Sequence, residues 1–68
     1  MIDKYNMPRS EWEKLIDEWI FDEKGRYILK RRLLDGICYE PLAEEVDMSV
    51  AQIKRIVYRL QNQLFKHL

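Results

Sequence analysis

Cysteine, long apolar runs and signal-like segments are rare or missing in this sequence, and each absence narrows the class of protein. Cys38 is the single cysteine in 68 residues, so no intramolecular disulfide framework can form, and one thiol alone cannot hold a structural zinc ion. No stretch approaches the roughly 18–20 apolar residues of a membrane-spanning helix. The N-terminus also lacks the apolar core of a secretory signal. We therefore expect a cytoplasmic protein without a metal or a cofactor.

The chain length sets the scale of the fold. With 68 residues, the sequence predicts a single domain over 1–68. A domain of this size buries only about 60% of the surface that its unfolded chain exposes, so short and tightly packed helices suit it best. The sequence contains no internal repeat, no low-complexity tract and no β-type alternation of useful length. The expected fold class is all-α, a small bundle of about four helices.

The formal net charge is zero, but the charged residues are unevenly distributed. Residues 1–23 contain three basic and seven acidic side chains, a net charge of −4, whereas residues 24–68 contain nine basic and five acidic ones, a net charge of +4. The last twenty residues carry four basic side chains and no acid: Lys54, Arg55, Arg59 and Lys66. Such asymmetry indicates contact with a polyanion on one face, and a solvated helix face is the alternative.

Two amphipathic segments precede the basic region. The first helix is expected at about residues 10–21, where Ser10 and Glu13 have the spacing of a capping box. Its apolar stripe follows the helical period: Trp12, Leu15, Ile16, Trp19 and Ile20. After a polar turn at 22–25, a second helix is expected at about 26–35. It should stop at Gly36, because glycine suits the left-handed backbone that often ends a helix.

The segment 39–66 has the pattern of two helices joined by a short turn. Ala43 in the first of them offers the small side chain that a close helix crossing requires. Ser49 is the expected N-cap of the last helix, and Gln52 stands at the reciprocal position of a capping box. The last helix then carries one apolar stripe: Ile53, Ile56, Val57, Leu60 and Leu64. This order predicts a C-terminal helix-turn-helix.

A family resemblance covers about half of the chain, over the stretch R-Y-I-L-K-R-R-L-L-D-G-I-C-Y-E-P-L-A-E-E-V-D-M-S-V-A-Q-I-K-R-I. It resembles the helix-turn-helix of bacterial sigma-factor region 4 and of related small phage or mobile-element regulators. The resemblance implies that the last helix enters the major groove of DNA, with RNA polymerase as a second partner in some members. Pro41 departs from the pattern, as does Asp47, where glycine is usual; aspartate tolerates the left-handed conformation. Nothing resembles the promoter-melting region, so a complete sigma factor is excluded.

The candidate DNA contacts lie on the face of the last helix opposite its apolar stripe. A wheel at about 100° per residue places there Ala51, Arg55, Tyr58 and Asn62, flanked by Gln52, Lys54 and Arg59, with Ser49 at the helix start. We expect Arg55 to bind guanine, Gln52 to pair with adenine and Ala51 to touch a thymine methyl group. We expect Lys54, Tyr58 and Arg59 to contact phosphates. An ordinary exposed helix surface is the alternative interpretation.

The end of the last helix is apolar and is a candidate dimer contact. Leu64, Phe65 and Leu68 would form this contact, because Phe65 lies off the core stripe. The alternative is that the same end folds back onto Trp12 and Trp19 within one chain.

The predicted function is sequence-specific binding of double-stranded DNA in the regulation of transcription. The rival function is a protein-binding module or inhibitor with the same fold. Its contact would be the acidic first helix, and its partner a nucleic-acid enzyme such as RNA polymerase or a defence nuclease. Tyr39, Arg31 and Arg32 could brace the DNA backbone, although a solvated face explains them equally well. No catalytic residue is expected, since His67 is the only histidine and lies near the chain end.

Overall fold

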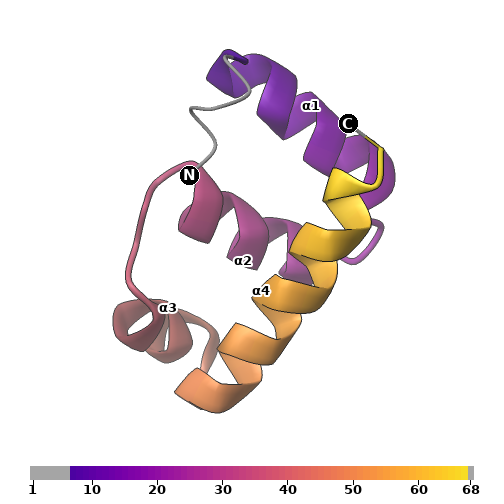
Figure 1. Ribbon diagram of the computed structural model, residues 1–68. Helices are drawn as coiled ribbons and strands as arrows, with labels where there is room; N and C mark the ends of the chain where they lie inside the picture. The colour runs from indigo at the N-terminus through magenta and orange to yellow at the C-terminus, as the bar shows by residue number, and fades with distance from the viewer. Residues whose placement is uncertain (1–6, 68) are drawn as a thin grey trace.

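Four α-helices joined by short connections make up the fold (Figure 1). The computed structural model describes residues 7–67. The helices are α1 (Arg9–Trp19), α2 (Glu23–Leu33), α3 (Tyr39–Val46) and α4 (Val50–Phe65), and the described residues contain no strand. The expected all-α class with about four helices is therefore confirmed.

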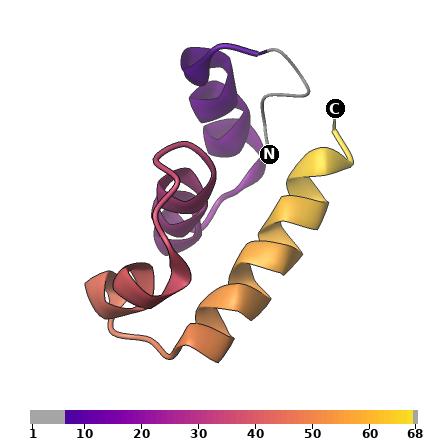
Figure 2. The same cartoon turned by 60° about the vertical axis from the view of Figure 1, so that its left-hand side comes forward.

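α4 is the longest helix and contacts each of the other three (Figure 2). α1, α2 and α3 follow one another along one side of the molecule, and α4 runs past them from α3 back to α1. The core between them is mainly aliphatic and consists of Trp12, Ile16, Ile20, Ile28, Leu29, Leu33, Leu42, Ala43, Ile53, Val57, Leu60 and Leu64. Because α4 buries one stripe in this core, the opposite side of the helix is left for solvent or a ligand.

α1 begins one residue earlier and ends two residues earlier than the sequence predicts. Its N-cap is Pro8, whose carbonyl oxygen accepts hydrogen bonds from the amides three and four residues on, at 3.1 and 3.3 Å. Proline fixes φ near −65° and has no N–H to satisfy, which suits it to a helix start. No side chain caps this end, so the predicted capping box of Ser10 and Glu13 is wrong. Ser10 lies inside the first turn instead.

The predicted polar turn at 22–25 is in fact the start of α2. The Asp22 carboxylate caps this helix by accepting a hydrogen bond from the Gly25 amide at 2.8 Å. Gly25 is buried, and a Cβ atom added there would lie 2.9 Å from the Leu60 side chain of α4. The missing side chain therefore allows α2 and α4 to approach each other closely. Gly25 thus lies within a helix, where a turn was expected from the sequence. Gly36, beyond the end of α2, has the expected positive φ, 70°.

The connection between α3 and α4 follows the prediction closely. Three residues separate the two helices, and among them Asp47 has a left-handed backbone with φ 56° and ψ 51°. Ser49 Oγ accepts a hydrogen bond from the Gln52 amide at 3.1 Å, and Gln52 Oε1 accepts one from the Ser49 amide at 3.0 Å. These two bonds complete the predicted capping box. Ala43 is 4% exposed, as expected for a small residue packed between helices.

The C-terminal end of α4 packs against α1 of the same chain. Leu64 is 0% exposed, and the Phe65 ring meets the Trp12 ring edge to face at a centroid distance of 6.2 Å. The prediction that Leu64 contacts a second copy is therefore wrong, because this side chain completes the core of its own chain. Leu68, the third residue of the predicted dimer contact, lies outside the described residues.

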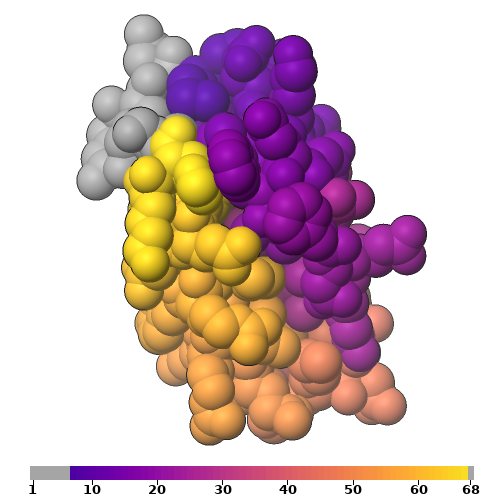
Figure 3. Space-filling model, turned by 90° about the vertical axis from the view of Figure 1, so that its right-hand side faces the viewer, coloured from indigo at the N-terminus to yellow at the C-terminus, as the bar shows by residue number. Residues whose placement is uncertain are grey.

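Two further contacts fix this end of α4 to α1. The His67 ring stacks on the Trp19 ring at a centroid distance of 3.6 Å. The Gln63 side chain donates a hydrogen bond to the Trp19 carbonyl oxygen at 3.0 Å. Figure 3 shows the yellow end of α4 lying directly against the violet surface of α1. The fold-back interpretation of the C-terminal end thus describes the observed packing.

Candidate nucleic-acid interface

The outward surface of α4 and its N-cap carries the eight residues that the sequence predicts as DNA contacts. All eight are exposed: Ser49, Ala51, Gln52, Lys54, Arg55, Tyr58, Arg59 and Asn62. The buried face of the same helix consists of Ile53, Val57, Leu60 and Leu64. The helix therefore separates an apolar side, which holds it in the fold, from a polar and cationic side.

The outward surface has a centre and two edges when the residues are placed at about 100° per position. The centre, opposite the core, consists of Ala51, Arg55 and Asn62. Lys54 and Tyr58 form the edge on the side of α3, where Lys54 lies near the Tyr39 ring. Arg59 lies on the opposite edge. An arginine and a small residue at the centre, with cations on both edges, match a groove that has a phosphate backbone on either side.

Ser49 and Gln52 are already engaged in the capping box. Gln52 Oε1 accepts hydrogen bonds from both the amide and the hydroxyl group of Ser49, at 3.0 and 3.2 Å. Pairing with adenine uses both the side-chain oxygen and the side-chain nitrogen of a glutamine. The adenine contact predicted for Gln52 would therefore require the capping box to open.

Among the described residues, none of the three basic residues of α4 is in an ion pair, whereas four of the seven basic residues of α1 and α2 are. Within residues 7–67, no carboxylate lies within ion-pair distance of Lys54, Arg55 or Arg59. By contrast, four basic residues of α1 and α2 each pair with a carboxylate: Arg9, Arg26, Lys30 and Arg31. Lys54, Arg55 and Arg59 lack ion pairs for two reasons. α4 contains no acid, and the fold brings no described carboxylate from another helix close to these side chains.

Arg31 connects Glu45 of α3 with Asp35, which follows α2. Its guanidinium group donates to Glu45 at 2.6 Å and to Asp35 at 2.9 Å, and Arg9 of α1 donates to Asp35 at 2.6 Å. The Tyr27 hydroxyl group donates to Glu45 at 2.7 Å. The hydrogen bonds from Arg31 hold the pKa of Glu45 and the pKa of Asp35 below their ordinary values. Arg31 is thus a link between helices, and its charge is already paired.

A second cluster surrounds the Tyr39 ring. The Arg32 guanidinium carbon lies 4.3 Å from the ring centroid and Lys54 Nζ lies 5.6 Å from it, both within cation–π range. Arg32 also donates to the Ile37 carbonyl oxygen at 3.0 Å. Proximity to the Tyr39 hydroxyl group raises the pKa of Tyr58. We call Arg32, Tyr39, Lys54 and Tyr58 the Tyr39 cluster.

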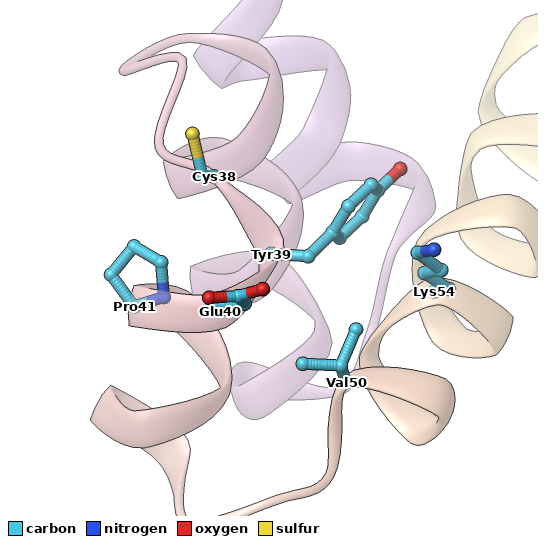
Figure 4. Close-up of a pocket in the computed structure, with 6 residues that line it drawn as sticks. All are labelled: Cys38, Tyr39, Glu40, Pro41, Val50 and Lys54. Atoms are coloured by element: carbon cyan, nitrogen blue, oxygen red, sulfur yellow. The ribbon is translucent and has the colours of Figure 1, made fainter.

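An open hollow adjoins this cluster, between the start of α3 and the first turns of α4 (Figure 4). Its volume is about 420 Å³, and it is lined by Cys38, Tyr39, Glu40, Pro41, Val50 and Lys54. Figure 4 shows the Tyr39 ring reaching across toward Lys54, with Val50 below them. The hollow therefore combines an aromatic and aliphatic lining with two charged side chains, Glu40 of α3 and Lys54 of α4.

Other kinds of site find little support in the described part of the chain. Residues 7–67 contain no group of three histidine, cysteine, aspartate or glutamate side chains placed to hold a metal ion. Cys38 is exposed, and His67 is stacked on Trp19, far along the chain from it. Over the same residues, none of the helices is long and apolar enough to cross a membrane.

No protein-family model, curated protein or solved structure matches this chain. Its function is therefore inferred from the arrangement of α4 and its surroundings.

Proposed function

We propose that this protein binds double-stranded DNA through α4, with α3 and α4 acting as a helix-turn-helix. One observation carries the proposal. The outward side of α4 bears Lys54, Arg55 and Arg59 with no acid in the helix and no ion-pair partner among the described residues. Exposed cations in this state keep their charge available for phosphates. The resemblance of residues 26–58 to sigma-factor region 4 points to the same use of the last helix.

In this proposal α4 lies in the major groove, which is wide enough to admit an α-helix. Arg55 at the centre donates two hydrogen bonds to the O6 and N7 atoms of guanine, and Ala51 contacts a thymine methyl group. Lys54 and Tyr58 on one edge, and Arg59 on the other, contact backbone phosphates. Base recognition at the centre and anchoring at the edges together give sequence-specific binding, which suits a regulator of transcription.

Selection from random duplex DNA tests this function directly. We expect one sequence to be enriched, and log affinity for it to fall linearly with log salt, with a slope of about −0.9 per phosphate contact. Arg55→Gln should weaken binding by about 1–3 kcal/mol at one base pair and affect random DNA less. Lys66→Gln removes one charge beyond the end of α4 and is the matched control. No duplex binding at low salt would overturn the proposed function.

A protein-binding function is favoured by a different feature, the exposed Phe21 side chain. It is 77% exposed in the connection between α1 and α2, and three acids within three residues of it are also exposed: Glu18, Asp22 and Glu23. A large exposed aromatic residue among acids suits contact with a basic protein surface. Phe21→Ala separates the two functions, because a protein that acts through α4 retains its full DNA affinity in this variant.

A further inference from the structure

The Tyr39 cluster lies beside α4 but draws its residues from three helices. Arg32 belongs to α2, Tyr39 is the first residue of α3, and α4 supplies Lys54 and Tyr58. Neither Arg32 nor Lys54 has a carboxylate within ion-pair distance among residues 7–67. Two cations therefore share one aromatic ring without a neutralising acid. An anion near both cations would be attracted by both and would offset their mutual repulsion.

The hydroxyl groups of the cluster have a donor to spare. Each phenol has one O–H donor, and the Tyr39 hydroxyl group is near enough to raise the pKa of Tyr58. Even when one hydroxyl group donates to the other, the second proton can be donated to an acceptor outside the pair. No side chain caps the start of α3 at this point, so the positive end of its dipole adds to the same field.

We propose that the Tyr39 cluster binds one backbone phosphate of the DNA strand that borders α4 on the side of α3. A phosphodiester carries one negative charge and several acceptor oxygens, which match the two cations and the spare hydroxyl donor. This contact rests on the proposed DNA-binding function and adds to it two residues outside α4, Arg32 and Tyr39. Because phosphate contacts fix orientation and register, a contact shared by three helices sets the angle at which α4 enters the groove.

Glu40 provides a test of opposite sign, because its charge opposes that of a bound phosphate. Its carboxylate lies in the lining of the hollow with Tyr39 and Lys54 (Figure 4). Glu40→Gln should therefore strengthen DNA binding by about twofold to fivefold. Glu44→Gln is the matched control, since Glu44 is an exposed acid of the same helix that does not line the hollow. Its gain should be smaller.

The decisive experiment combines Lys54→Gln with duplexes in which one phosphate is replaced by an uncharged methylphosphonate. The neutral linkage is moved along each strand of the enriched duplex, and affinity is measured for the parent protein and for the variant. On unmodified DNA, Lys54→Gln should weaken binding about fivefold to tenfold and reduce the salt slope by about 0.9. On the duplex that lacks the charge at the cluster, the same substitution should have no further effect, because both changes remove one interaction.

Two additional variants identify the cluster itself as the binding group. Tyr39→Leu removes the ring that Arg32 and Lys54 share, and its effect on affinity should disappear on the same methylphosphonate duplex as that of Lys54→Gln. The effect of Arg59→Gln, on the opposite edge, should disappear on a duplex with the methylphosphonate at a different position. Circular dichroism and thermal unfolding identify any variant that has lost its fold, and Lys54→Gln changes only an exposed side chain.

The outcomes separate this inference from the proposed function. If the parent binds the enriched duplex but Lys54→Gln and every neutral linkage act additively, the cluster binds no phosphate, and α4 binds DNA without a phosphate contact at Lys54. A gain for Glu40→Gln no larger than that for Glu44→Gln would also overturn the inference. If the parent binds no duplex at low salt, both the function and the inference are overturned.

Discussion

The two parts of this molecule use their charged residues in opposite ways. Among α1, α2 and α3, several charged side chains join one helix to the next: Lys30 contacts Asp17 at 2.8 Å, and Arg31 contacts Glu45 at 2.6 Å. In α4 no described basic side chain pairs with an acid, and the helix is attached through its apolar stripe. The net charge of zero for the whole chain conceals this division.

The difference explains why the overall charge does not describe the surface of α4. Asp17, Asp35 and Glu45 are acids that would neutralise a nearby cation, but each is already held by basic residues of α1 or α2. The cations of α4 have no such internal competitor among the described residues. An anion that binds α4 therefore has no ion pair to break first, and less of the binding free energy is spent on rearrangement.

Removing the apolar attachment of α4 should have the largest effect on stability. Leu64 is 0% exposed, so Leu64→Ala should lower the free energy of unfolding by about 2–5 kcal/mol through lost burial and a residual cavity. Because no ion pair holds α4 within the described residues, the loss should be equal at low and high salt. Urea unfolding at both salt concentrations measures this. A loss that shrinks as salt is added would show that charge also attaches α4.

The next largest effect should come from enlarging the contact between α3 and α4. Ala43 is 4% exposed, and Ala43→Leu should lower the free energy of unfolding by about 1–3 kcal/mol because the added methyl groups force the helices apart. The same displacement moves Tyr39 away from Lys54, so DNA affinity should fall as well. Thermal unfolding and duplex titration measure the two effects, with Ala43→Ser as the control of similar volume. A variant that melts and binds like the parent would exclude Ala43 from a helix crossing.

The parts of the fold that the sequence predicts well depend on residues close together in the chain. The left-handed Asp47, the capping box of Ser49 and Gln52, and the exposed side of α4 all follow from spacings of a few residues. Such signals are local, because a turn or cap is completed by groups within one turn of helix. The α3–α4 connection and the exposure of the candidate site were therefore accessible from sequence.

The parts that the sequence misses depend on distant residues. Gly25 looks like a turn signal until Leu60, which packs against it from another helix, is known. Arg31 and Arg55 are both arginines on helix surfaces, yet only the fold brings Glu45 to one of them. The Tyr39 cluster is similar, since Lys54 and Tyr58 share a helix edge by spacing but the Tyr39 ring that both approach comes from α3. Pairing across helices is a tertiary property that local spacing does not contain.

A smaller effect should distinguish paired from unpaired arginines. Arg31→Gln should lower the unfolding midpoint, because it removes contacts to Glu45 and Asp35, and this loss should shrink at high salt. Arg55→Gln, the matched substitution on α4, should change the free energy of unfolding by less than about 0.5 kcal/mol while it weakens DNA binding. Equal changes in the unfolding midpoint for the two variants would remove the distinction between the two parts of the molecule.

The smallest expected effect is a loss of stability in acid, and it should arise from the ion pairs among α1, α2 and α3. The hydrogen bonds from Arg31 hold the pKa of Glu45 and the pKa of Asp35 below their ordinary values, so both carboxylates stabilise the folded state while they are ionised. This contribution is complete above the ordinary carboxyl pKa of about 4 and is lost as the pH falls through the lower folded values. The urea midpoint should therefore fall between about pH 6 and pH 3.

Glu45→Gln should be less stable than the parent at pH 6 but lose less stability on acidification, because one of the two carboxylates is gone. Since α4 contains no carboxylate to protonate, its charge stays the same over this range. Parallel pH profiles for the parent and the variant would show that the Arg31–Glu45 contact contributes nothing to stability.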